Sequence, residues 1–267
     1  MGVHGATSRW RPVDVVGPVA VFAAFIGLWY LVREVLMSPS RRFLVPPPHR
    51  VVNESFLTWS HLRPMLDGLW ATTRVALTGL AIAIVLGVGL AVLMSQARWL
   101  ERALLPYVVA LQAVPVLAFV PLIGALFDFD GRARVVVVVM VALFPVVSTT
   151  LHGLLSVDPA HHDLFTLQGA SRWTRLRKLM LPAALPSMFT GFRIAAALAV
   201  VGAVVGDLFF RQGEPGIGRL IDVYRSRLFM ERMYGAVVLA ALLGIVVFAL
   251  FGALAQRAVG HWHGTPR

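Results

Sequence analysis

The chain has 267 residues, of which 58% are hydrophobic and 14% are charged, and its mean hydropathy is +0.78. Soluble domains have about 45–50% apolar and about 25% charged residues, so this composition excludes an ordinary soluble domain. The chain has no cysteine, which excludes disulfides, thiolate metal sites and cysteine nucleophiles. The net charge of +11 permits nucleic-acid binding, but arginines beside anionic lipid headgroups explain it better. We therefore expect no nucleic-acid partner.

Six apolar runs are long enough to cross a bilayer, which takes about 20 residues in a helix. They cover about residues 15–37, 67–94, 103–127, 135–155, 185–210 and 234–256. Backbone groups in lipid must form hydrogen bonds within their own segment, so these runs predict helices. The first run is long and no small-residue cleavage site follows it, so we interpret it as a retained span rather than a signal peptide.

The connections between the runs differ in character. Residues 38–64 contain three consecutive prolines and predict an extended start followed by a surface helix near 51–62. Residues 95–102 and 128–134 are short enough for tight turns, and 211–233 begins with glycines and a proline, which favours an irregular loop. An even number of spans puts both termini on one side. Arginines are numerous on both sides, however, so the positive-inside rule does not decide the orientation.

The polar connection between the fourth and fifth runs carries helix start and stop signals. Asp158 stands before a proline and is suited to cap a short helix. Gly169 is suited to end that helix in a left-handed conformation, and Ser171 can cap a second helix. Pro182 and Pro186 are expected to break this second helix before the fifth span. The pattern predicts a helix–glycine–helix elbow.

Residues within this elbow match a known motif. The matching groups are Asp163-Leu164-Phe165, Gly169-Ala170 and Leu179-Met180-Leu181-Pro182. They resemble the cytoplasmic signature loop of permease subunits in binding-protein-dependent ABC importers, described as Glu-Ala-Ala, then a glycine, then Ile-x-Leu-Pro. Asp163 keeps the acidic first position, whereas Leu164 and Phe165 are larger than alanine. The resemblance implies that these residues couple the chain to an ATPase: Asp163, Leu164, Phe165, Gly169, Ala170, Arg172, Trp173 and Pro182.

The similarity extends over about residues 69–252. Segments 111–115, 190–195 and 216–218 are similar to the nitrate, sulfonate and taurine branch of these permeases. The resemblance implies an all-α integral membrane protein with the type I ABC importer permease fold, about six transmembrane helices and a cytoplasmic coupling helix. It implies a cell inner membrane protein with both termini cytoplasmic. The expected division is 1–66 for the tail, first helix and extracytoplasmic loop, 67–256 for the permease domain, and 257–267 for a cytoplasmic tail.

The sequence assigns the energy source to other chains. A P-loop requires a Gly-Lys pair, and the single lysine, Lys178, follows an arginine. We expect no catalytic residue, no metal site and no cofactor in this chain, with ATP and Mg²⁺ bound by partner subunits. The resemblance implies two ABC ATPase subunits, a second permease subunit in a homodimer, an extracytoplasmic solute-binding protein and membrane lipid as partners. It suggests a sulfonate, nitrate or taurine-like anion, or a pyrimidine or thiamine-precursor compound, as the solute.

Polar residues within the apolar runs are candidates for the translocation pathway, because such residues are costly in lipid and often functional. The candidates are Gln112, Pro115, Arg193 and Asp207. Gln112 can bond backbone groups that Pro115 frees, or contact substrate. Arg193 lies near a span end, where snorkelling to the interface is the alternative. Asp207 can pair with an arginine in the following loop or face the gate.

A stand-alone channel or secondary carrier is the alternative function. Carriers commonly contain two matched halves with interrupted helices, and no inverted repeat is visible in this sequence. That alternative also leaves the elbow motif unexplained, so the permease interpretation is preferred.

Overall fold

The computed structural model describes residues 12–113 and 115–259, and within these ranges the chain is helical with no strand. The helices are α1 (Pro12–Leu31), α2 (Pro48–Val52), α3 (Trp59–Ser95), α4 (Arg98–Ala113), α5 (Val116–Leu126), α6 (Gly131–Leu155), α7 (Pro159–Leu167), α8 (Arg172–Arg175), α9 (Leu181–Phe209), α10 (Ile217–Ser226) and α11 (Met230–Val259). Short π or 3-10 turns join some of them: η1 (Val32–Leu36), η2 (Pro39–Leu44), η3 (Asn53–Leu57) and η4 (Leu176–Met180). The all-α prediction is confirmed.

Five single helices are long and apolar enough to cross a membrane. They correspond to the first, second, fourth, fifth and sixth predicted runs. The third predicted span is wrong as a single helix, because α4 and the helix over Ala118–Leu126 are bent by 106° to each other. Pro115 lies at the break with ψ near 102°. It has no N–H to continue the helical hydrogen bonds, so an extended residue separates two helices here.

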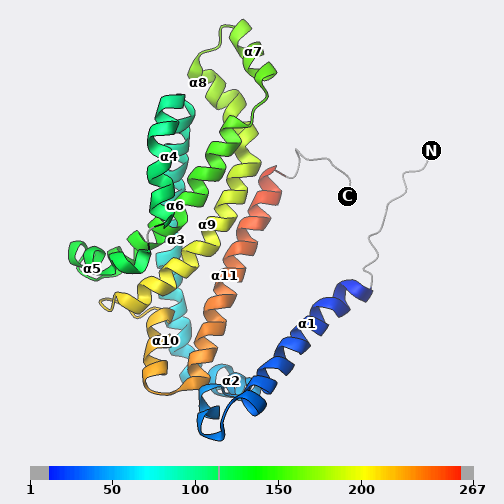
Figure 1. Cartoon of the computed structure of the whole chain (residues 1–267), viewed down its shortest axis with the longest axis vertical. Helices are drawn as coiled ribbons and strands as arrows, with labels where there is room; N and C mark the ends of the chain where they lie inside the picture. Colours follow the sequence, from blue (N-terminus) through cyan, green and yellow to red (C-terminus); the bar gives the residue numbers. More distant parts are fainter. Residues whose placement is uncertain (1–11, 114, 260–267) are drawn as a thin grey trace.

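The molecule has two ends (Figure 1). Helices α7 and α8 project at one end, and α2 and α10 lie at the opposite end. Helix α1 stands apart from the bundle along most of its length and meets it near α2, where the Trp29 indole donates to the Pro46 carbonyl at 3.1 Å and lies against Tyr234 of α11. The first described residues of α1 and the last of α11 therefore extend toward the α7 end.

The core is a three-helix layer of α3, α6 and α9. Apart from Leu80, its buried side chains are small or β-branched, among them Ala83, Val138 and Ala199. Small residues let membrane helices approach closely, so that van der Waals contacts hold them together where lipid supplies no hydrophobic drive. Helices α6 and α9 come close at Gly191 of α9, where an added Cβ would overlap the Thr149 hydroxyl of α6 and lie 2.9 Å from the carbonyl oxygen of Pro145. Helices α6 and α9 therefore pack backbone to backbone.

The expected break at Pro182 and Pro186 is wrong. Residues Arg172–Phe209 form one continuous helical rod of 38 residues, and Pro182 lies in the first turn of α9. The turn directly before it, η4, has π geometry. A proline ring clashes with the carbonyl one α-helical turn earlier, and the wider π turn at this point relieves that clash without ending the helix.

Two loop predictions need smaller corrections. The surface helix expected near 51–62 lies earlier, as α2 and η3 over Pro48–Leu57, and α3 already begins at Trp59. The turn expected over 128–134 ends at Asp130, whose carboxylate accepts a hydrogen bond from the Arg132 amide at 2.7 Å and caps α6. An aspartate cap satisfies amides at the helix start, so α6 begins before the valine run.

Candidate functional site

The elbow forms as the local signals predict. The Asp158 carboxylate accepts a hydrogen bond from the Ala160 amide at 2.8 Å and caps α7. Gly169 ends the helix with φ of +62°, and a Cβ there would meet no atom within 4 Å. The glycine is therefore required by its backbone conformation and not by crowding. The Ser171 hydroxyl accepts from the Thr174 amide at 3.2 Å and caps α8.

Side-chain and backbone contacts fasten the two arms of the elbow together. The Arg175 guanidinium donates to the Thr166 hydroxyl at 2.9 Å, and the Ala170 amide donates to the Phe165 carbonyl at 2.9 Å. Below the elbow, Leu176 and Met180 are 2% and 8% exposed and belong to an apolar cluster shared with α3, α4 and α6. These contacts attach the elbow firmly to the ends of α3, α4 and α6 that lie next to it.

The elbow exposes three large apolar side chains among its polar ones. Leu164, Leu167 and Trp173 are 54%, 86% and 68% exposed, and Phe165 and Ala170 are half-buried. Asp163 and Arg172 are exposed beside them. Large exposed aromatic and aliphatic side chains on a rigid projection are typical of surfaces that another protein covers. The structure therefore gathers the predicted coupling residues on one projection, with the exception of Pro182, which lies inside the rod.

A second group of polar residues is buried near the other end of α9. Asp207 is 0% exposed, and its carboxylate accepts from the Arg134 guanidinium at 3.1 Å and from the Thr72 hydroxyl at 2.5 Å. Thr72 and Arg134 are 0% and 2% exposed. We call Thr72, Arg134 and Asp207 the buried node. It joins α3, α6 and α9, because each of these helices supplies one member.

The buried node also holds the loop between α9 and α10. Arg134 donates to the carbonyls of Gln212 at 2.6 Å and Glu214 at 2.9 Å. The Ile217 amide donates to the Thr72 hydroxyl at 2.8 Å. A buried charge requires a partner and further hydrogen bonds to offset its desolvation, and these contacts provide them. The node therefore fixes the start of α10 against the bundle.

From the sequence, an arginine in the loop after α9 is the expected ion-pair partner of Asp207. The structure shows instead that the partner is Arg134 of α6. Sequence reasoning missed Thr72 and Arg134 as site residues. The sequence places Arg134 in a turn, and Thr72 resembles any other hydroxyl in a long helix. The available signal was the arginine directly before the valine run of α6, since a charge at that place requires a partner.

The four pathway candidates are not gathered at one place. Arg193 and Asp207 are fourteen residues apart on α9, which is about 21 Å along a helix. The Arg193 guanidinium lies 3.9 Å from the ring centroid of Phe248, a cation–π contact toward α11. Gln112 and Pro115 are exposed at the break between α4 and α5. Their roles in transport stay predictions.

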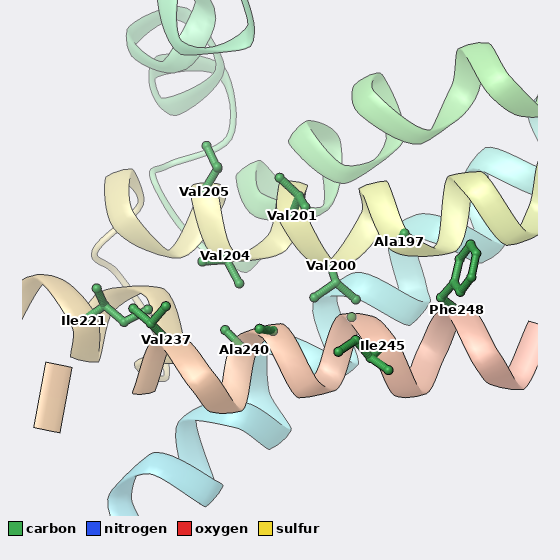
Figure 2. A pocket seen from close by; sticks show the side chains of 12 residues that line it. Ala197, Val200, Val201, Val204, Val205, Ile221, Val237, Ala240, Ile245 and Phe248 are labelled. Atoms are coloured by element: carbon green, nitrogen blue, oxygen red, sulfur yellow. The ribbon is translucent and has the colours of Figure 1, made fainter. Parts of the chain in front are cut away.

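An apolar groove of about 760 Å³ runs between α9 and α11 (Figure 2). Val200, Val204, Val237 and Ile245 project into it from the two helices, and its other lining residues are also apolar. A groove of this composition has no polar group with which to bind a polar solute. It suits lipid chains or another apolar helix. In the part of the chain that the structure describes, no group of three or more acidic, histidine or cysteine side chains could hold a metal ion.

Several apolar spans, a broken span and an elbow that projects from the bundle define a multi-pass membrane protein. Comparison with known proteins gives the family. Residues 83–260 match the family described as binding-protein-dependent transport system inner membrane component, and the chain belongs to it. It is the non-catalytic permease subunit of an ABC importer for a small solute.

Curated relatives match over most of their lengths. The chain is 32% identical over 249 residues to the formylaminopyrimidine transport permease protein ThiX of Halalkalibacterium halodurans, covering 90% of this chain and 93% of the relative. It is 32% identical to the riboflavin transport system permease protein RibX of Chloroflexus aurantiacus, covering 86% and 85%. It is 25% identical to the taurine transport system permease protein TauC of Escherichia coli, covering 98% and 96%.

Solved structures share the fold. A chain of the MetNI methionine ABC transporter in an inward-facing conformation superposes with a TM-score of 0.66 at 17% identity, covering 75% of this chain and 98% of that one. A chain of an amino acid ABC transporter with histidines superposes with a TM-score of 0.56 at 18% identity, covering 74% and 93%. The type I importer permease fold is thus confirmed.

Proposed function

We propose that the elbow of α7 and α8 is the coupling site of an ATP-driven importer and docks in a groove of a separate ABC ATPase. The observation that carries this proposal is the exposed apolar tip formed by Leu164, Leu167 and Trp173 on a rigidly capped projection. The rod over Arg172–Phe209 continues from the elbow into the membrane. A displacement of the tip by an ATPase would therefore reach the spans without an intervening hinge.

The proposed assembly contains two such permease chains, two ATPase subunits and an extracytoplasmic solute-binding protein. The family description itself names dependence on a binding protein. Docking of the elbow on an ATPase requires the α7 end to be cytoplasmic. The described ends of α1 and α11 extend toward that same end, so both termini are then cytoplasmic. ATP and Mg²⁺ bind to the ATPase subunits in this assembly.

The proposed solute is a small polar compound of the kind named for the relatives. The relatives carry the names of formylaminopyrimidine, riboflavin and taurine transport systems. A pyrimidine or thiamine-precursor compound, or a small anion such as a sulfonate, is the corresponding class for this chain. Ligand screening of the solute-binding protein that copurifies with the chain would identify the compound.

Substitutions at two glycines with positive φ test the coupling site. Gly169 and Gly213 have φ of +62° and +84°, and a Cβ at either would meet open space. Gly169→Val is expected to lower copurification of the ATPase and to abolish uptake, because a β-branched residue resists the left-handed conformation and distorts the elbow. Gly213→Val carries the same strain at the opposite end and should retain the ATPase. Equal ATPase retention by both variants would refute the coupling site.

A further inference from the structure

The α6–α9 interface contains a pocket of about 240 Å³ with a composition unlike the rest of the bundle. Its lining residues are Ser148, Thr149, His152, Ser187 and Thr190. Every one of them has a hydroxyl or an imidazole, although both helices are apolar spans. His152 and Thr190 are exposed, and the other three are half-buried. This face of α6 and α9 therefore gathers five polar side chains within two apolar spans, although their carbon atoms form most of the surface open to the pocket.

The pocket begins at the last turn of α6 and extends about 10 Å into the span. Ser148 is seven residues before Leu155, the last residue of α6, which is about 10 Å along the helix. A Cβ added to Gly153 would approach the Ser187 Cβ to 2.8 Å, so Ser187 lies at the level of the last turn of α6. Thr190 is almost one turn further along α9, level with the middle of the pocket.

Three of the hydroxyls could be tolerated in lipid, because each bonds to its own helix. Thr149 and Ser148 donate to the Pro145 carbonyl at 2.7 and 3.4 Å, and Thr190 donates to the Pro186 carbonyl at 3.0 Å. Such bonds satisfy a hydroxyl without water. They leave the oxygen lone pairs free to accept further hydrogen bonds, so these side chains are also competent to contact a solute.

The hydrogen bonding of His152 and Ser187 indicates whether lipid or water fills the pocket. Among the described residues, no hydrogen bond reaches the His152 imidazole or the Ser187 hydroxyl within the distance limits of such bonds. An unbonded polar group costs several kcal/mol in hydrocarbon, roughly 2–7 for an amide or hydroxyl, whereas polar residues within spans face a bundle interior or a water-filled cavity. The imidazole of His152 and the hydroxyl of Ser187 therefore favour water over lipid at this pocket.

The two sides of α9 reinforce this contrast. Its groove with α11 is lined only by apolar residues (Figure 2), and its pocket with α6 only by polar ones. We propose that the α6–α9 pocket lines the aqueous translocation pathway and contacts the solute there. Its imidazole and four hydroxyls can donate and accept hydrogen bonds, and it contains no carboxylate. The ligand class is a small polar solute, neutral or anionic. The proposal rests on the permease function proposed above.

Thiol labelling tests this assignment cleanly, because the chain has no native cysteine. Single variants Ser187→Cys, Thr190→Cys and Ser148→Cys change little in size. The matched control is Leu250→Cys on α11, 53% exposed on an apolar face at a similar distance from its helix end. The probe is a negatively charged, membrane-impermeant methanethiosulfonate applied to the full-length chain in nanodiscs.

The cysteine thiolate attacks the sulfenyl sulfur of the reagent, forms a mixed disulfide and releases methanesulfinate. An apolar environment raises the pKa of a thiol and so lowers the fraction of thiolate. The pocket variants are therefore expected to react at least about tenfold faster than Leu250→Cys. Rates at Ser187→Cys and Thr190→Cys equal to the control rate would overturn the proposal, whether lipid or a second copy of the chain covers the pocket. Fast labelling together with unchanged ATPase retention by Gly169→Val would instead refute the coupling site alone.

Discussion

Replacing Asp207 with alanine tests the buried node directly. The substitution removes the carboxylate that Arg134 faces at 3.1 Å and Thr72 at 2.5 Å. Arg134 is 2% exposed, so its guanidinium cannot reach water and remains as an unpaired buried charge. Breaking a buried ion pair by removing one partner costs about 3–5 kcal/mol of stability.

A matched aspartate in the same region serves as control. Asp222 pairs with Arg211 and Arg225, whose side chains are 70% and 69% exposed. Exposed pairs contribute about 0–1 kcal/mol. Since 1 kcal/mol shifts the Tm of a chain of this size by about 2–4 °C, we expect Asp207→Ala to lower the Tm by roughly 6–20 °C. Asp222→Ala removes two exposed pairs and is expected to lower the Tm by at most about 8 °C.

The assay is thermal unfolding of the purified chain in mild detergent, at one fixed scan rate because unfolding of such proteins is often irreversible. A third variant, Asp207→Ala with Arg134→Met, removes the stranded charge and should recover part of the lost Tm. Recovery will be incomplete, because the carbonyls of Gln212 and Glu214 lose their donor. A Tm of Asp207→Ala equal to that of Asp222→Ala would refute the reasoning.

Two further predictions use matched pairs. Trp173→Ala should leave the Tm unchanged, since the side chain is 68% exposed, but should weaken ATPase copurification about tenfold or more, as removal of an aromatic anchor does. The control, Trp59→Ala, removes a side chain that is 64% exposed at the opposite end of the molecule and should retain the ATPase. Equal losses of ATPase in the two variants would contradict the docking surface. Gly191→Ala should lower stability by about 1–3 kcal/mol, because the new Cβ would overlap the Thr149 hydroxyl and lie 2.9 Å from the Pro145 carbonyl oxygen. Gly89→Ala, whose Cβ meets open space, should be neutral or stabilising in thermal unfolding.

The elbow could be predicted from the sequence because its determinants are local. Caps at Asp158 and Ser171 and the left-handed Gly169 depend on residues within one helical turn, and all three have the expected geometry. The buried node could not be predicted in the same way. Its members Thr72 and Asp207 are 135 residues apart in sequence, and no periodicity or spacing joins residues across that distance. Only packing of α3 against α9 brings them together.

Two prolines show that a local rule can also predict a helix break that does not occur. The same physical fact, a missing N–H, produced a sharp break at Pro115 and no break at Pro182. At Pro182 the preceding π turn absorbs the clash, and the helix is held on both sides by buried contacts of Leu176 and Ala184. At Pro115 the side chain is exposed. Tertiary packing therefore decides whether a proline bends a span, and a single sequence does not reveal that packing.

The continuity of the rod connects the two sites. Thirty-eight residues of helix over Arg172–Phe209 span about 57 Å, with the elbow at one end and Asp207 at the other. Because α6 and α9 pack closely at Gly191, a tilt imposed at the elbow by the proposed ATPase partner would move both helices together. The node then carries the same motion into the loop before α10. The polar pocket lies between α6 and α9, so the pair that would transmit the motion also lines the proposed pathway.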